Sequence, residues 1–247
     1  MEIIFLGTNG WYDTETGNTI CTLVKTRDYY IILDAGSGIQ KMDQFCKKKK
    51  PSYLFLSHFH LDHIFGLHIL NKIRCFHRLY IFGPTGAKKI LQKFINVPFT
   101  MPISHLSFGV ELHELPKAIK RLPFPVEVKP LLHSSLTLGY RIELDGKIIS
   151  YCPDTGYCKA AVELSRNADL LIAECAYKSG QNNPKWPHLN PEAAALIAQK
   201  AKVKQLALVH FDAYIYETLK SRNDAERAAR KTFGRVVSTI DGMQLEI

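Results

Sequence analysis

The length and composition of the chain favour one compact, soluble domain. Its 247 residues, 46% of them hydrophobic, can bury a full core. No apolar stretch approaches the roughly 20 residues that cross a bilayer, and residues 1–7 have neither the basic nor the apolar region of a secretory signal. We therefore expect a single domain over residues 1–247, in the cytoplasm and without membrane contact.

The net charge indicates the class of binding partner, and the cysteine content indicates whether the thiols are reduced. The formal charge of +9 favours an anionic partner such as a phosphate or a nucleic acid, because long-range attraction raises the rate of encounter. The densest basic run, Lys47–Lys50, is typical of a solvated loop, and we assign it no role. The six cysteines form no C-x-x-C pair in a chain too long to need disulfides, so we expect reduced thiols.

Short β-branched runs alternate with helical stretches along the first half of the chain. The predicted strands are Glu2–Leu6, Thr19–Thr26, Tyr29–Leu33, Tyr53–Leu56 and Leu79–Phe82. The predicted helices are Ser37–Cys46, Ile64–Leu70 and Thr85–Phe94.

The second half repeats this alternation after a proline-rich stretch, Pro116–Pro125. A hairpin is expected across Asp145-Gly146. Asn190 and Pro191 are typical of the start of a helix. The predicted strands are Val126–Leu132, Gly139–Leu144, Lys147–Tyr151, Leu170–Ala173, Gln205–Val209, Val236–Ser238 and Gln244–Glu246, and the helices are Pro191–Lys202 and Tyr216–Phe233. This order indicates an α/β fold in which two sheets pack face to face with helices outside.

Three imidazoles and a carboxylate fall within six residues directly after the strand Tyr53–Leu56. A strand would direct His58 and His60 to one face, and a loop entering the next helix could turn Asp62 and His63 back toward them. Zinc prefers such nitrogen and oxygen ligands. Without a metal, four uncompensated polar side chains beside an apolar strand would carry a heavy desolvation cost. The segment therefore predicts a metal site.

Four residues cannot complete two metal sites, and three further candidates follow predicted strands. These are His133, Asp154 and His210. Residues on loops at strand ends are often functional because a rigid scaffold positions them. Taken alone, His133 could be an ordinary loop residue and Asp154 a turn former.

The motif H-x-H-x-D-H resembles the signature of the metallo-β-lactamase superfamily, and other segments resemble its ribonuclease Z and phosphodiesterase branch. Asp154-Thr155 is similar to the branch's G-D-T block, with Pro153 in place of the glycine. The other similar segments are Phe5–Thr8, Leu33–Gly36, His133 with Gly139–Ile142, Ala173–Ala176, His188–Asn190 and Val209–Phe211. The resemblance implies a four-layer αββα sandwich of two mixed sheets and a metal-dependent hydrolase.

The resemblance also implies a centre of two zinc ions, with manganese or iron as alternatives. Such a centre keeps a net positive charge suited to a phosphodiester, and a bridging hydroxide would attack the phosphorus. The implied ligands are His58, His60 and His133 for one metal, Asp62, His63 and His210 for the other, and Asp154 between them.

Further roles follow from the same resemblance. Asp62 could also orient the hydroxide, and Asp34 is expected to steady a ligand histidine. Glu174 and His188 correspond to a pair that donates a proton to the leaving group. The alternative for this pair is a surface salt link.

The sequence departs from ribonuclease Z at one point that affects the substrate. Ribonuclease Z carries a flexible arm that grips tRNA, whereas here the segment from His133 to Asp154 holds only the predicted hairpin. We therefore expect a phosphodiesterase for small or cyclic phosphodiesters. The alternatives are a ribonuclease Z-like enzyme of tRNA 3′ processing, and a non-catalytic, metal-containing binding subunit. The sequence does not decide whether the protein forms a homodimer.

Two sets of residues receive no catalytic role. The apolar, proline-broken stretch Phe94–Ile103 could line the pocket, form a lid or pack in the core. The histidines outside the motifs are expected to be structural: His68, His77, His105 and His113.

Overall fold

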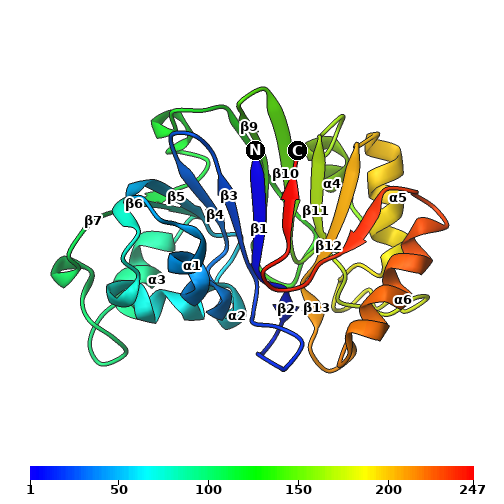
Figure 1. The fold of residues 1–247 in the computed structure, drawn as a ribbon, viewed down its shortest axis with the longest axis horizontal. Coiled ribbons are helices and arrows are strands. Elements are labelled where there is room, and N and C mark those ends of the chain that lie inside the picture. Colours follow the sequence, from blue (N-terminus) through cyan, green and yellow to red (C-terminus); the bar gives the residue numbers. More distant parts are fainter.

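The computed structural model describes residues 1–247, and its centre is a pair of sheets with helices on their outer sides (Figure 1). The first sheet has seven strands in the order β15-β1-β3-β4-β5-β6-β7. Their bounds are β1 (Glu2–Gly7), β3 (Cys21–Lys25), β4 (Tyr30–Leu33), β5 (Lys50–Phe55), β6 (Phe76–Gly83), β7 (Gly109–Glu114) and β15 (Gln244–Glu246). The pairs from β15 to β4 are antiparallel and those from β4 to β7 are parallel, so the sheet is mixed.

The second sheet is also mixed and has six strands in the order β14-β12-β11-β10-β9-β8. Its bounds are β8 (Val126–Pro130), β9 (Leu138–Leu144), β10 (Lys147–Cys152), β11 (Leu170–Glu174), β12 (Gln205–Val209) and β14 (Val236–Ser238). The predicted hairpin joins β9 to β10, with Asp145 and Gly146 at φ values of 50° and 73°. Two residues with positive φ are what a tight hairpin turn of this kind requires.

Alternate residues of each strand pack in different layers, as the period of two in a strand requires. In β1, Ile3 and Phe5 belong to the buried cluster between the two sheets, together with Tyr140 of the second sheet. Ile4 and Leu6 belong to the cluster that the first sheet shares with its helices. A third cluster lies between the second sheet and its own helices. The four-layer αββα sandwich is therefore confirmed.

Helices cover the two outer faces of the sandwich (Figure 1). The first sheet is flanked by α1 (Met42–Phe45), α2 (Leu61–Ile64) and α3 (Ala87–Phe94), with the 3₁₀ turns η1 (Ser37–Lys41), η2 (Phe65–Lys72) and η3 (Ile103–His105). The second sheet is flanked by α4 (Lys159–Leu164), α5 (Pro191–Ala201) and α6 (Leu219–Arg230), and η4 (Ile119–Arg121) lies between the halves in sequence. None of the helices has the length and apolar character of a bilayer-spanning segment.

Three of the predicted helix boundaries were wrong. The stretch Ser37–Cys46 is a 3₁₀ turn followed by the short helix α1. The helix predicted over Tyr216–Phe233 begins only at Leu219, because the Thr218 side chain accepts a hydrogen bond from the Ser221 amide and starts the helix there. The helix predicted over Ile64–Leu70 is instead the short helix α2, which begins at Leu61, followed by the 3₁₀ turn η2. Asp62 and His63 therefore lie inside α2 rather than on a loop before a helix.

A two-stranded parallel ladder connects the segment after β1 to the segment after β12. It pairs β2 (Asn9–Gly10) with β13 (Phe211–Asp212) and was not predicted, because two-residue strands leave no periodic pattern in a sequence. The ladder places the segment after β1 next to His210. This contact shapes one side of the site described below.

Candidate metal centre

The residues predicted to carry the chemistry come together at one end of the sandwich. His58 follows β5, Asp154 follows β10, Glu174 ends β11, and His210 follows β12. Since β10, β11 and β12 are parallel neighbours, their carboxyl ends meet at one edge. His133 reaches the same place from the loop between β8 and β9.

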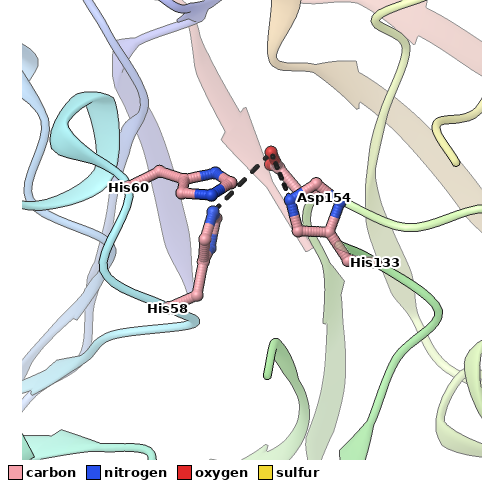
Figure 2. A group of neighbouring side chains, drawn as sticks. All are labelled: His58, His60, His133 and Asp154. Carbon is pink, nitrogen blue, oxygen red and sulfur yellow. Dashed lines mark ion pairs between the residues drawn. The ribbon is translucent and has the colours of Figure 1, made fainter. Parts of the chain in front are cut away.

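The first group of side chains holds three histidines and one aspartate (Figure 2). One ligand atom from each of His58, His60, His133 and Asp154 lies within 4.8 Å of the others. Asp154 Oδ2 is 3.8 Å from His58 Nε2 and 3.7 Å from His133 Nε2. The four residues therefore face a common point.

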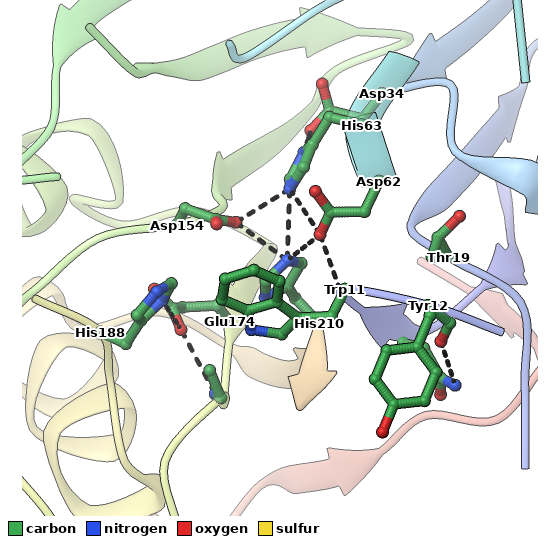
Figure 3. Close-up of polar contacts among 12 residues, drawn as sticks. Trp11, Tyr12, Thr19, Asp34, Asp62, His63, Asp154, Glu174, His188 and His210 are labelled. Atoms are coloured by element: carbon green, nitrogen blue, oxygen red, sulfur yellow. Dashed lines mark hydrogen bonds and ion pairs between the residues drawn. The ribbon is translucent and has the colours of Figure 1, made fainter. Parts of the chain in front are cut away.

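The second group lies on the other side of the same aspartate (Figure 3). His210 Nε2 is 3.1 Å from Asp62 Oδ2 and 3.2 Å from His63 Nε2. Asp154 Oδ1 is 3.1 Å from His63 Nε2 and 3.2 Å from His210 Nε2. Asp154 thus directs one carboxylate oxygen toward each group.

These two groups fit metal ions by their geometry and by their unpaired polar atoms. When an ion lies about 2.1 Å from each of four tetrahedral ligand atoms, any two of those atoms are about 3.4 Å apart. The distances between nitrogen and oxygen atoms in the two groups are close to this value. Buried atoms without a hydrogen-bond partner include His58 Nε2 and Asp154 Oδ1, the latter close to two imidazoles but without hydrogen-bond geometry. Buried polar atoms are normally satisfied, so a cation at each point would supply the missing partner.

Electrostatics in the second group also favour a cation. Burial by itself would raise the pKa of Asp154, yet the surrounding imidazoles, His210 first, hold it well below its usual range. Burial would lower the pKa of His63, yet Asp154 and Asp34 raise it well above its usual value. The carboxylates therefore attract positive charge into this space, which bound metal ions could provide in place of protons.

Asp34 fixes the orientation of the His63 ring. Its Oδ2 lies 2.8 Å from His63 Nδ1 and accepts a hydrogen bond of 2.6 Å from the Tyr151 hydroxyl. The Ser57 amide donates to Asp34 Oδ1 at 2.7 Å. A carboxylate on Nδ1 holds the ring with Nε2 free to act as a ligand, which is the arrangement expected for Asp34.

Glu174 and His188 form a buried pair beside the two groups (Figure 3). His188 Nδ1 lies 2.9 Å from Glu174 Oε1, and the side chains are 4% and 0% exposed, so a surface salt link is excluded. The Ala176 amide donates to Glu174 Oε2 at 3.2 Å and fixes the carboxylate. Burial opposes the charged imidazole, but Glu174 outweighs it and raises the pKa of His188 to about 9.

A cavity of about 330 Å³ opens onto both groups and onto His188. Two of its lining residues, Trp11 and Trp186, were not singled out from the sequence. The backbone amide of Trp11 donates a hydrogen bond to Asp62 Oδ2 at 2.8 Å, which holds Trp11 beside the second group. A signal was available, since these are the only two tryptophans of the chain and Trp186 precedes His188 by two residues.

The apolar stretch Phe94–Ile103 lies away from the cavity. Phe94 and Ile103 pack against the cluster beneath the first sheet, while Val97 and Phe99 are exposed. The stretch therefore contributes packing and surface rather than a wall of the cavity at the candidate centre. The four other histidines also lie outside the two groups; His113, for example, pairs with Glu111 at 3.4 Å.

Comparison with known proteins places the chain in a family. The model of the β-lactamase superfamily domain matches residues 29–211. The chain belongs to this superfamily. Ribonuclease Z of Lactiplantibacillus plantarum is 26% identical to it over 313 aligned positions, which cover 100% of this chain and 99% of the relative. Ribonuclease Z of Pyrococcus horikoshii is 26% identical over 267 positions, covering 85% and 86%.

Solved structures share the fold over nearly the whole length of this superfamily member. The metallo-β-lactamase fold protein YhfI from Bacillus subtilis has a TM-score of 0.80 at 22% identity, covering 99% of each chain. The short form of human tRNase Z has a TM-score of 0.75 at 24% identity, covering 100% of this chain and 99% of the other. The predicted fold and branch are confirmed, and the protein is a hydrolase of the metallo-β-lactamase fold.

Proposed function

We propose that this hydrolase is a two-metal phosphodiesterase that acts on small or cyclic phosphodiesters. The observation that carries the proposal is the position of Asp154 between the two groups of histidines, beside a buried His188–Glu174 pair. The proposed ligands are His58, His60, His133 and Asp154 for one metal and Asp62, His63, His210 and Asp154 for the other. Zinc suits these nitrogen and oxygen ligands, with manganese or iron as alternatives.

Each group of protein residues has a distinct part in the proposed reaction. When bound, the metals supply Lewis acidity toward the phosphate and activate a water molecule. Asp62, fixed by the Trp11 amide, orients the attacking water. Glu174 favours the protonated imidazole of His188, and because Nδ1 faces Glu174, Nε2 is the nitrogen that gives a proton to the leaving alkoxide.

The size of the cavity supports a small substrate. At about 330 Å³ it lies near the lower end of ligand sites, which span about 300–1,000 Å³. Strands β9 and β10 take up most of the residues between His133 and Asp154, so this segment contains no tRNA-binding arm. The alignment with the Lactiplantibacillus plantarum ribonuclease Z covers 313 positions against 247 residues here, so that relative carries segments with no counterpart in this chain.

The experiment compares kcat/KM for cyclic nucleotides, bis(nitrophenyl) phosphate and precursor tRNA, with metal content measured on the same preparation. We expect the small diesters to be turned over more efficiently, because remote contacts with tRNA are unavailable to position the scissile bond. Asp154→Asn should abolish turnover. Asp145→Asn makes the same chemical change in the exposed hairpin turn, where asparagine also tolerates positive φ, and should leave turnover intact.

The second candidate is a ribonuclease Z-like endoribonuclease, which the names of the relatives favour. Loose tRNA binding to a chain of charge +9 would be electrostatic and would weaken steeply between low and physiological salt. Efficient cleavage of precursor tRNA after the acceptor stem at physiological salt, with little activity on small diesters, would favour this candidate. Bound metal without turnover of any diester would instead indicate a binding subunit.

A further inference from the structure

Both tryptophans of the chain meet over the cavity of the candidate centre. Trp11 follows β2, whereas Trp186 lies between β11 and α5, and the two ring centroids are 6.3 Å apart with 22° between the planes. Trp186 also lies 6.3 Å from the His60 ring at an angle of 7°. Three flat rings with nearly the same orientation therefore border the place where a substrate phosphate would sit.

Neither tryptophan fills the core. Trp11 is 54% exposed and Trp186 is 36% exposed, although tryptophan gains much from burial. Leu61 beside them on the cavity wall is 64% exposed, so the rim is apolar as well as aromatic. Burial in the core therefore does not account for two large rings at this position.

The backbone at Trp11 indicates that its position serves a purpose. Its φ of 69° is in the left-handed region, which bulky residues rarely adopt and which is strained for them. The conformation is held by the Trp11 amide on Asp62 Oδ2 and by the Asn9 side chain, which donates to the Tyr12 carbonyl at 3.1 Å. The Asp62 carboxylate therefore faces a candidate metal position and also holds the backbone of Trp11.

We propose that Trp11 and Trp186 form a stacking platform for the nucleobase of a nucleotide whose phosphate occupies the candidate centre. Indole faces stack on any base because every base has a flat π-face, which an alkyl or sugar phosphate lacks. The inference rests on the proposed function and refines it: the substrate class is a small phosphodiester that carries a base next to the scissile phosphate.

The test measures binding rather than turnover. The metal-loaded protein is titrated with adenosine 5′-monophosphate and with ribose 5-phosphate, which carry the same phosphate but differ by the base. Tryptophan emission reports directly on the site, because the chain has no other tryptophan. We expect adenosine 5′-monophosphate to quench the emission saturably, with a Kd about tenfold or more below that of ribose 5-phosphate.

Variants separate stacking from other contacts. Trp186→Ala and Trp11→Ala should each raise the Kd for adenosine 5′-monophosphate by about fivefold or more, with a smaller change for ribose 5-phosphate. Trp186→Phe keeps a flat ring and should restore most of the preference. Phe99→Ala removes an aromatic ring that is 59% exposed away from the cavity, and should leave both affinities unchanged.

Equal affinity of the wild-type protein for the two ligands would overturn the inference. So would an equal loss of both ligands in the tryptophan variants, or emission that responds to protein concentration but not to nucleotide. Failure of the proposed function has a different signature, namely that no diester is hydrolysed. Binding preference and turnover are measured separately, so either can fail while the other holds.

Discussion

Gly10 lies directly against the imidazole of His210. A methyl group on Gly10 would come within 2.5 Å of His210 Cε1 and 2.8 Å of its Nε2. His210 itself has a φ of 51°, so its backbone is turned to bring the ring to this place. The contact depends on the β2–β13 ladder, which joins segments from the two ends of the chain.

The first prediction is that Gly10→Ala displaces His210 and weakens the metal position it shares with Asp62 and His63. Atoms closer than normal van der Waals contact must separate, and here the ring is buried and has little room to move. Elemental analysis after dialysis should find less metal than in the wild-type protein. Gly234→Ala is the matched control, because a methyl group there would contact nothing within 4 Å. Equal metal retention in both variants would show that the contact is unimportant.

The second prediction concerns Arg222 of α6, which holds the segment around Thr8 and Asn9 that leads to Gly10. Arg222 is 1% exposed, and its guanidinium donates hydrogen bonds to Thr8 Oγ1 at 2.8 Å and to Asn9 Oδ1 and lies 4.7 Å from the Phe211 ring centre. Arg222→Ala should lower the free energy of unfolding by at least about 2 kcal/mol, through lost packing and unsatisfied buried oxygens. Urea denaturation measures the change.

The control for Arg222 lies in the same helix. The side chain of Arg227 is 67% exposed, so Arg227→Ala should change the free energy of unfolding by no more than about 0.5 kcal/mol. If the two variants were equally stable, the buried guanidinium would not be holding the segment around Thr8 and Asn9.

The third prediction tests His188 as a general acid. His188→Ala should slow turnover of diesters with poor alkoxide leaving groups by about 10²–10⁴-fold, because such groups need a proton in the transition state. Nitrophenyl diesters should lose much less, since nitrophenolate leaves without protonation. Both metals should stay bound. Equal losses on the two substrate types would assign His188 to substrate binding instead.

Part of the candidate site could be predicted from the sequence, and part of it could not. His58, His60, Asp62 and His63 could be predicted as a metal site because all four lie within six residues of one another after an apolar strand. The start of α2 could not, because an α-helix of four residues has no readable period.

The parts of the site that depend on distant contacts were not predicted. Gly10, Trp11 and Arg222 gain their positions from the β2–β13 ladder and from α6, which meet only in the folded chain. No local pattern marks Gly10 as the residue that touches His210. Strand β7 was missed even though its apolar and polar residues alternate, and it lies at the edge of the first sheet.

The most direct test of the central claim is the metal content of the protein purified without chelator. Seven ligand side chains exceed what one tetrahedral site uses, so elemental analysis should find about two transition-metal ions per chain. Asp62→Ala and His210→Ala should each lower that number. A fully loaded preparation with a single ion, unchanged in both variants, would contradict the two-metal centre.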